Sequence, residues 1–170
     1  NGTGTINATN LDASLSANFA TFNPSMTLNV DWSSASNLTY NGNLTNVDTL
    51  TVSSGTMTAD ASILNSATAI TNSATINVTN LDAIPTMNLT KITGGTTNAD
   101  WSGSDTFSGN LGSSNLTVSS GTMTVSTGTI SGSGTVAVNG GATLSADATK
   151  LSGETISGAG NITISNLQSK

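Results

Sequence analysis

Side-chain oxygens recur in one short pattern near the start and the middle of the chain. Asn10 and Asp12 lie two positions apart in Thr-Asn-Leu-Asp, and Asn80 and Asp82 lie in an identical copy. Oxygen ligands suit Ca²⁺, and a turn containing Asn-x-Asp offers a carboxylate, an amide oxygen and backbone carbonyls. Asn and Asp also form turns without a metal. The pattern therefore predicts a turn, with calcium binding at these four residues as the alternative.

A third copy of the pattern lacks the carboxylate. It contains Asn166, Leu167 and Gln168, so an amide replaces the acid of the other two copies. A calcium site that the fold required would keep its acidic ligand in every copy. We therefore favour a corner of the scaffold over a metal site for this pattern, and we expect no bound cofactor.

The chain has few ionisable side chains. About 7% of its 170 residues are charged, the net charge is −6, and His and Cys are absent. The absence of Cys excludes disulfides and thiolate metal sites. The cationic side chains are Lys91, Lys150 and Lys170. Three lysines cannot form a basic stripe along phosphates, so nucleic-acid binding and attraction to anionic membranes are disfavoured.

One pair of acids is close enough in sequence to be considered for catalysis. Asp100 and Asp105 flank Trp101, and general acid–base chemistry requires such carboxylate pairs. The equivalent Asp31 has no second acid at the matching place near Ser36. We therefore predict no catalytic residues and no enzymatic activity.

The acidic pattern belongs to longer internal repeats. Gly4–Asp12 recurs at Ala74–Asp82 and again at Gly160–Gln168, and Leu50–Thr58 reappears unchanged at Leu116–Thr124. Self-similarity of this kind is the signature of repeat architectures. We expect one β-solenoid segment over residues 1–170. Its modules would cover about 5–74 and 75–160, and a third would begin at 161.

The spacing of the repeats favours a β-helix over a sandwich. Thr9, Thr79 and Ser165 hold the same place in the three copies and lie 70 and 86 positions apart. Three and four turns would then contain about 23 and about 21 residues each, a length that suits one turn of a solenoid. The spacing therefore predicts an all-β parallel β-helix of about seven rungs.

Strands with one buried face are predicted along most of the chain. Thr, Val and Ile are frequent, and apolar residues alternate with polar ones in segments such as Thr75–Thr79 and Thr135–Asn139. Gly-containing pairs between these segments supply tight turns. The predicted core consists of Ile6, Leu28, Val30, Leu50, Val52, Met57, Ile63, Ile76, Val78, Leu116, Val118, Met123, Val125, Ile130, Val136, Val138, Leu144, Leu151, Ile156, Ile162 and Ile164.

Two tryptophans hold equivalent positions in the modules. Asp31-Trp32-Ser33 is repeated as Asp100-Trp101-Ser102. Their bulk exceeds what one rung easily holds, so we expect Trp32 and Trp101 to cap a wide corner or to lie outside on a flank. A structural role is favoured over a platform for stacking ligands.

Residues 115–164 carry a family resemblance. The phrase NLTVSSGTMTVSTGTISGSGTVAVNGGATLSADATKLSGETISGAGNITI resembles the passenger repeats of bacterial autotransporter adhesins and of filamentous-haemagglutinin-like exoproteins. The resemblance implies a right-handed parallel β-helix and a secreted or surface-exposed bacterial protein that serves in adhesion, aggregation or surface-layer building.

The sequence thus predicts a stiff, adhesive surface fibre. Its partners would be neighbouring copies or flanking repeats, surface glycans or host proteins, without nucleic acid and without membrane insertion. The alternative is a self-assembling subunit of an extracellular filament or surface layer. A third hypothesis is ice binding by a flat face of Thr-x-Thr pairs, namely Thr3/Thr5, Thr49/Thr51, Thr56/Thr58, Thr122/Thr124 and Thr127/Thr129.

Overall fold

The described chain is built mostly of short parallel β-strands. A computed structural model describes residues 4–130, 132 and 134–167. Its helices are one α-helix, α1 (Ala61–Ser66), and the short 3₁₀ helices η1 (Leu11–Ala13), η2 (Leu81–Ala83), η3 (Leu89–Lys91) and η4 (Ala148–Lys150). Within the described ranges, no helix has the length and hydropathy of a membrane-spanning segment. Mostly β structure with parallel sheets and almost no helix is consistent with the predicted parallel solenoid.

The chain divides into two compact units. Unit 1 contains Asn1–Val78 and Lys91–Thr97, and unit 2 contains Thr79–Thr90 and Asn98–Lys170. The expectation of one segment with three modules stays a prediction.

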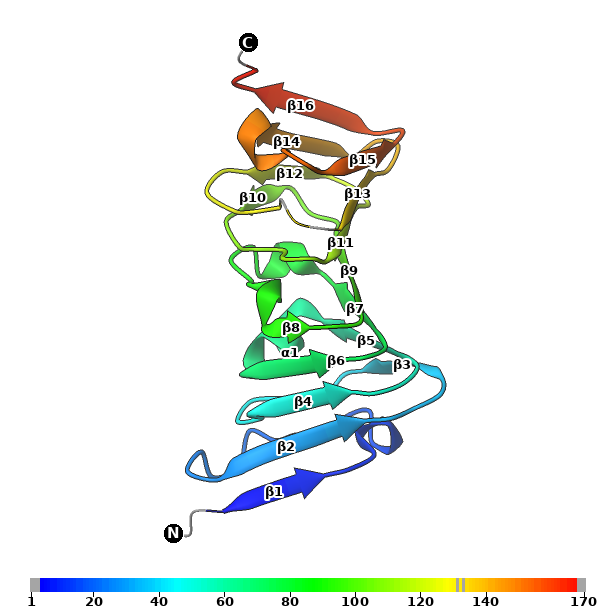
Figure 1. The fold of residues 1–170 in the computed structure, drawn as a ribbon, viewed down its shortest axis with the longest axis vertical. Coiled ribbons are helices and arrows are strands. Elements are labelled where there is room, and N and C mark those ends of the chain that lie inside the picture. The colour runs from blue at the N-terminus through cyan, green and yellow to red at the C-terminus, as the bar shows by residue number, and fades with distance from the viewer. Residues whose placement is uncertain (1–3, 131, 133, 168–170) are drawn as a thin grey trace. The chain divides into compact units, whose positions relative to one another are not determined.

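Unit 1 contains two parallel sheets. One has the strand order β1-β2-β4-β6-β8, and the other contains the order β3-β5-β7. The arrows of β1, β2, β4 and β6 point the same way in Figure 1. The strands are β1 (Thr5–Ala8), β2 (Thr27–Trp32), β3 (Asn37–Tyr40), β4 (Thr49–Val52), β5 (Thr56–Asp60), β6 (Ala69–Asn72), β7 (Thr75–Thr79) and β8 (Ile92–Thr93).

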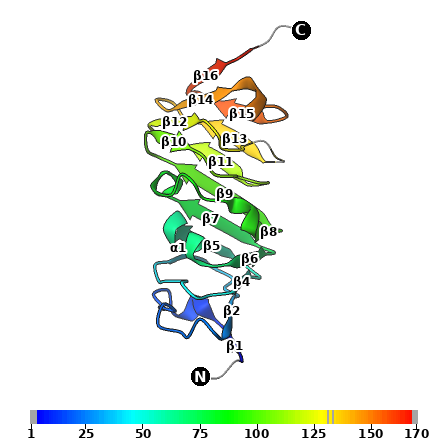
Figure 2. The same cartoon turned by 90° about the vertical axis from the view of Figure 1, so that its left-hand side faces the viewer.

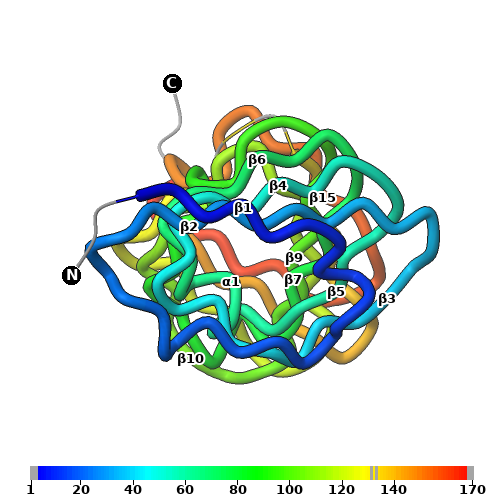
Figure 3. The backbone as a smooth tube through the Cα atoms, turned by 90° about the horizontal axis from the view of Figure 1, so that it is seen from below, coloured from blue at the N-terminus to red at the C-terminus, as the bar shows by residue number. Residues whose placement is uncertain are grey.

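Strands of unit 1 pair with strands one turn of chain further on. Thr5 pairs with Thr27, and Asn29 pairs with Thr49. The chain therefore travels round an interior and returns to the same sheet, as the blue and cyan turns do in Figure 3. We call each such turn a rung.

Unit 2 repeats this organisation. Its sheets contain the orders β9-β11-β13-β15 and β10-β12-β14-β16. In Figure 2, β10, β12, β14 and β16 follow one another upward in that order. Partner residues lie 17 to 21 positions apart, from Asn98 with Asn115 to Thr122 with Thr143. The strands are β9 (Thr96–Trp101), β10 (Asp105–Phe107), β11 (Asn115–Val118), β12 (Thr122–Val125), β13 (Thr135–Val138), β14 (Thr143–Asp147), β15 (Thr155–Gly158) and β16 (Asn161–Ser165).

The first two copies of the Gly4–Asp12 repeat lie in different sheets. The strand of the first copy is β1 and that of the second is β7. Three ladder steps lead from β1 through β2 and β4 to β6, and β7 then follows β6 directly along the chain. The stretch of chain between these two copies therefore contains three full rungs and one further side of a rung. The extra side fits because each of these rungs has fewer residues than the repeat spacing predicts.

The cores have the predicted alternation in most strands, but β1, β15 and β16 contain no buried position. In β4 and β11, Leu50, Val52, Leu116 and Val118 are buried and their neighbours are half-buried. The core prediction is wrong for Ile162 and Ile164, which are 43% and 38% exposed, because β16 pairs with β14 alone among the described strands. Ile6, Ile63 and Ile156 are half-buried.

Glycine is required at one corner of each unit. Gly55 and Gly121 both have a φ of 68°, in the left-handed region that side chains disfavour. A Cβ on Gly55 would lie 2.1 Å from the carbonyl oxygen of Ser34, and one on Gly121 would lie 2.2 Å from that of Gly103. The chain thus passes close to the backbone of the previous rung here.

We expect Gly121→Ala to lower the free energy of unfolding by about 1–3 kcal/mol, since it adds both a clash and a strained φ. Gly140→Ala is the matched control, because a Cβ at Gly140 meets no atom within 4 Å. Urea unfolding followed by circular dichroism measures both. Equal stability of the two variants would contradict the close approach.

Candidate functional site

Three of the repeated sequence patterns meet at one corner in each unit. We call this set of residues the corner column. In unit 1 it consists of Asn10, Leu11, Asp12, Ser33, Ser53 and Ser54, and in unit 2 of Asn80, Leu81, Asp82, Ser102, Ser119 and Ser120. These residues come from three successive rungs, so repeats that are separate in the sequence are neighbours in space.

The first layer of the column is a tight turn around a left-handed asparagine. Asn10 has φ 59° and ψ 47°, and Asn80 has φ 52° and ψ 44°. Asparagine tolerates this conformation better than most residues. The turn directs the following leucine inward, so Leu11 is 4% exposed and Leu81 is 0% exposed. The Asn therefore turns the chain after the strand, and the buried Leu packs the corner against the core.

The aspartate of the turn bonds to the next rung. Asp12 Oδ1 accepts a hydrogen bond from the Ser33 backbone N–H at 3.3 Å. Asp82 Oδ1 accepts one from the Ser102 N–H at 3.1 Å and another from the Ser102 hydroxyl at 3.3 Å. A carboxylate thus satisfies a backbone donor at the corner, where the strand ladder has ended.

Serine hydroxyls bond the third layer to the second. Ser54 Oγ donates to the Ser33 carbonyl oxygen and Ser120 Oγ to that of Ser102, each at 2.7 Å. Ser53 and Ser119 donate to the carbonyl oxygens of Trp32 and Trp101, each at 3.1 Å. The two units therefore build the same three-layer hydrogen-bond pattern from the same repeated residues.

The corner columns contain the residues predicted as calcium ligands. Each column brings one carboxylate next to an asparagine and a serine. One carboxylate oxygen of Asp82, Oδ1, already accepts hydrogen bonds from Ser102. Among residues 4–130, 132 and 134–167, no three acidic side chains gather in one place. In the third copy Asn166 has the same left-handed φ, 52°, and Gln168 lies outside the described residues. Calcium binding stays a prediction.

We expect Asp82→Ala to lower the free energy of unfolding by about 1–2 kcal/mol, because the Ser102 N–H loses a charged acceptor. Asp82→Asn keeps an acceptor oxygen and should retain most of that stability. Thermal unfolding with added CaCl₂ and with a chelator tests the metal in the same samples. A calcium-dependent rise in Tm that disappears in Asp82→Asn would show that the column is a metal site.

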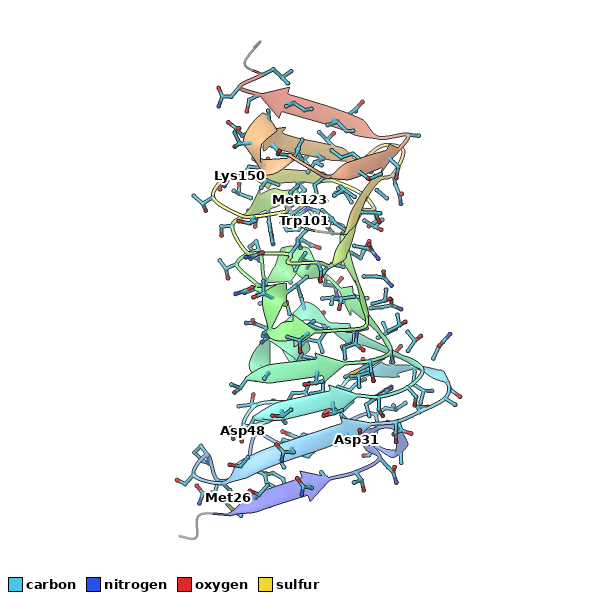
Figure 4. The ribbon with its side chains drawn as sticks, viewed as in Figure 1. Met26, Asp31, Asp48, Trp101, Met123 and Lys150 are labelled. Carbon is cyan, nitrogen blue, oxygen red and sulfur yellow. The ribbon has the colours of Figure 1, made fainter. Side chains whose placement is uncertain are left out.

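Both tryptophans are buried in the cores. Trp32 and Trp101 are 0% exposed, so the expectation of an outer flank is wrong. Each indole lies edge-on to another ring, with centroids 6.5 Å from Tyr40 and 6.0 Å from Phe107. The interior of unit 2 around Trp101 and Met123 is seen in Figure 4. Each core therefore holds its indole against the edge or face of an aromatic partner.

The two indoles differ in hydrogen bonding. Trp101 Nε1 donates to the Gly103 carbonyl oxygen at 2.9 Å. Trp32 Nε1 is buried and has no acceptor among the described residues. An unsatisfied buried donor costs free energy, whereas a satisfied one contributes modestly.

We expect Trp101→Phe to destabilise the protein by about 1 kcal/mol more than Trp32→Phe does, since both lose ring volume and Trp101→Phe alone loses a hydrogen bond. Denaturant unfolding of the two variants compares them. Equal losses would show that the Gly103 bond contributes nothing.

Two helix N-caps, Asp60 and Asp147, were not predicted from the sequence. Asp60 and Asp147 end β5 and β14 and accept backbone N–H bonds from Ser62 and Thr149, each at 2.8 Å. The shared pattern Ala-Asp-Ala followed by Ser or Thr was the available signal. Hydrogen bonds from Asn166 and then Thr149 hold the pKa of Asp147 below its usual value.

The remaining charged candidates serve local structure. Asp105 Oδ1 accepts from the adjacent Thr106 N–H at 2.7 Å, and Asp100 lies on β9, opposite Thr117 of β11. Lys91 Nζ donates at 2.8 Å to the carbonyl oxygens of Asn65 and Ala67 near the end of α1. Burial lowers the pKa of Lys91.

Hydroxyl groups form short rows on the outer faces of the sheets. In unit 2, Thr122 pairs with Thr143 and Thr124 with Ser145. In unit 1 the predicted Thr-x-Thr pairs are divided, with Thr49/Thr51 on β4 and Thr56/Thr58 on β5, in different sheets. Thr3 lies outside the described residues. The pairs of unit 1 therefore do not line one face.

Comparison of the chain with protein-family models, with curated proteins and with solved structures finds no match.

Proposed function

We propose that the chain is a stiff structural segment of a surface fibre with an adhesive outer face. The observation that carries the proposal is the bonding of each rung to the next, by parallel strand ladders on the sides and by the corner columns at the bends. Such bonding resists bending without any disulfide or metal. The function is then mechanical support and contact, without catalysis or a cofactor.

The outer face fits contact with sugars or proteins. Outward positions carry Thr, Ser and Asn in place of charges, as in the Asn7 and Asn29 pair, whose side chains bond at 2.9 Å. Hydroxyls and amides both donate and accept hydrogen bonds, as glycans do. With few charges, recognition would depend on short-range hydrogen bonds over many rungs and would vary little with salt.

The finer architecture and location belong to the same proposal. We infer a right-handed β-helix of about seven rungs, and a secreted or surface-exposed position on a bacterium, as in the adhesin and exoprotein repeats that residues 115–164 resemble. A low charge and a hydroxyl-rich surface support this location.

A self-assembling filament or surface-layer subunit is the second candidate. It is favoured by β16, where Ile162 and Ile164 are exposed beside an edge that no described strand covers. The two candidates differ in whether the chain alone forms polymers.

We expect beads coated with the purified chain to adhere to mammalian cells or to glycan-coated surfaces more than uncoated beads do. A double variant, Thr124→Glu with Ser145→Glu, places like charges on neighbouring outward positions and should reduce adhesion. The matched double variant, Thr124→Ser with Ser145→Thr, preserves both hydroxyls and should not. Adhesion no greater than that of uncoated beads, on every surface, would remove the adhesive function.

A further inference from the structure

Strand β16 has apolar side chains beside an edge that no other described strand covers. It pairs with β14, through Leu144 with Ile162 and Ala146 with Ile164, and is the last described strand in its sheet. Figure 1 shows it in red, next to β14. Leu167, two residues after the end of β16, is 73% exposed. An uncharged strand with open N–H and C=O groups is a template for another strand.

The same motif is covered elsewhere in the chain. Ile76 and Val78 hold the places of Ile162 and Ile164 in the second copy and are 0% and 1% exposed, against 43% and 38%. Leu81 holds the place of Leu167 and is fully buried. The third copy therefore has the side chains and the left-handed Asn166 of a covered corner but lacks a covering rung among the described residues.

A complementary edge exists on β1. Among the described strands β1 pairs with β2 alone, and Ile6 and Ala8 are half-buried. Residues 4–8 and 161–165 are all uncharged. Because β1 and β16 carry copies of the same repeat, stacking them would place Ile6 over Ile162, Ala8 over Ile164 and Leu11 over Leu167.

We propose that β16 of one copy of this chain binds β1 of a second copy as a parallel strand. The pairs β1 with β2 and β14 with β16 are both parallel, and this contact would continue their pattern across two molecules. Each molecule would use different surfaces at its two contacts, so the association is head-to-tail, and it produces open fibres where the rotation between copies does not close a ring. This contact rests on the proposed fibre function and names the surfaces that build the fibre.

The first test measures association of the 170-residue chain. We expect sedimentation velocity to show species that grow with concentration. Ile164→Lys and Ile6→Lys should each weaken association about tenfold or more, because a lysine at the apolar contact would be buried without a partner. Thr163→Lys and Thr5→Lys, which change outward positions of the same strands, should associate as the unaltered chain does. Circular dichroism and thermal unfolding confirm that each variant is folded.

Mixing the two blocked variants makes the test specific. Ile6→Lys retains an intact β16 and Ile164→Lys retains an intact β1, so an equimolar mixture should form dimers and nothing larger. If β16 instead bound β16 symmetrically, Ile6→Lys would dimerise alone and mixing would change nothing, which would overturn the proposal. A monomer at every concentration would also overturn it. Bead adhesion of monomeric Ile164→Lys tests the adhesive function independently.

Discussion

Parallel hydrogen-bonded pairing between one rung and the next holds this protein together. The strands have two to six residues, and strands this short are not stable alone. Each becomes stable because its backbone donors and acceptors are satisfied by strands one rung away. Parallel pairing in turn requires the chain to travel round and return beside the strand it left, one rung further along. The length of the rung and the sharpness of its corners are therefore the conditions that the sequence must meet.

The corner columns solve the problem that this pairing creates. At a corner the ladder stops, and its backbone groups would lack partners. The Asp and Ser side chains of one rung bond to the backbone of another there, as between Asp82 and Ser102 and between Ser120 and Ser102. The small serines and the glycine after them also allow adjacent rungs to approach closely. This explains why the most faithfully repeated patterns of the chain are corner residues as well as core residues.

The same arrangement accounts for the unusual composition. Parallel sheets are commonly covered on both faces and then contain continuous apolar runs. Here one face is buried and the other is outward, so the strands alternate, and their outward positions hold Thr, Ser and Asn. These residues bond to one another between rungs, as Asn98 and Asn115 do at 2.9 Å. The surface is thereby polar with few charges, and neighbouring rungs gain further hydrogen bonds.

Local sequence was sufficient to predict the short strands, their buried faces and the corner turns, because these follow from alternation and from the conformational preferences of Asn and Gly. It also identified Trp32 and Trp101 as equivalent. It did not place them, since whether a rung can enclose an indole depends on distant partners such as Tyr40 and Phe107. The folded chain was needed to show that two copies of one motif lie in different sheets, because that depends on the summed lengths of all rungs between them. It was also needed to show that Ile162 and Ile164 are exposed, because burial is set by the presence of a neighbouring strand and not by the residue itself.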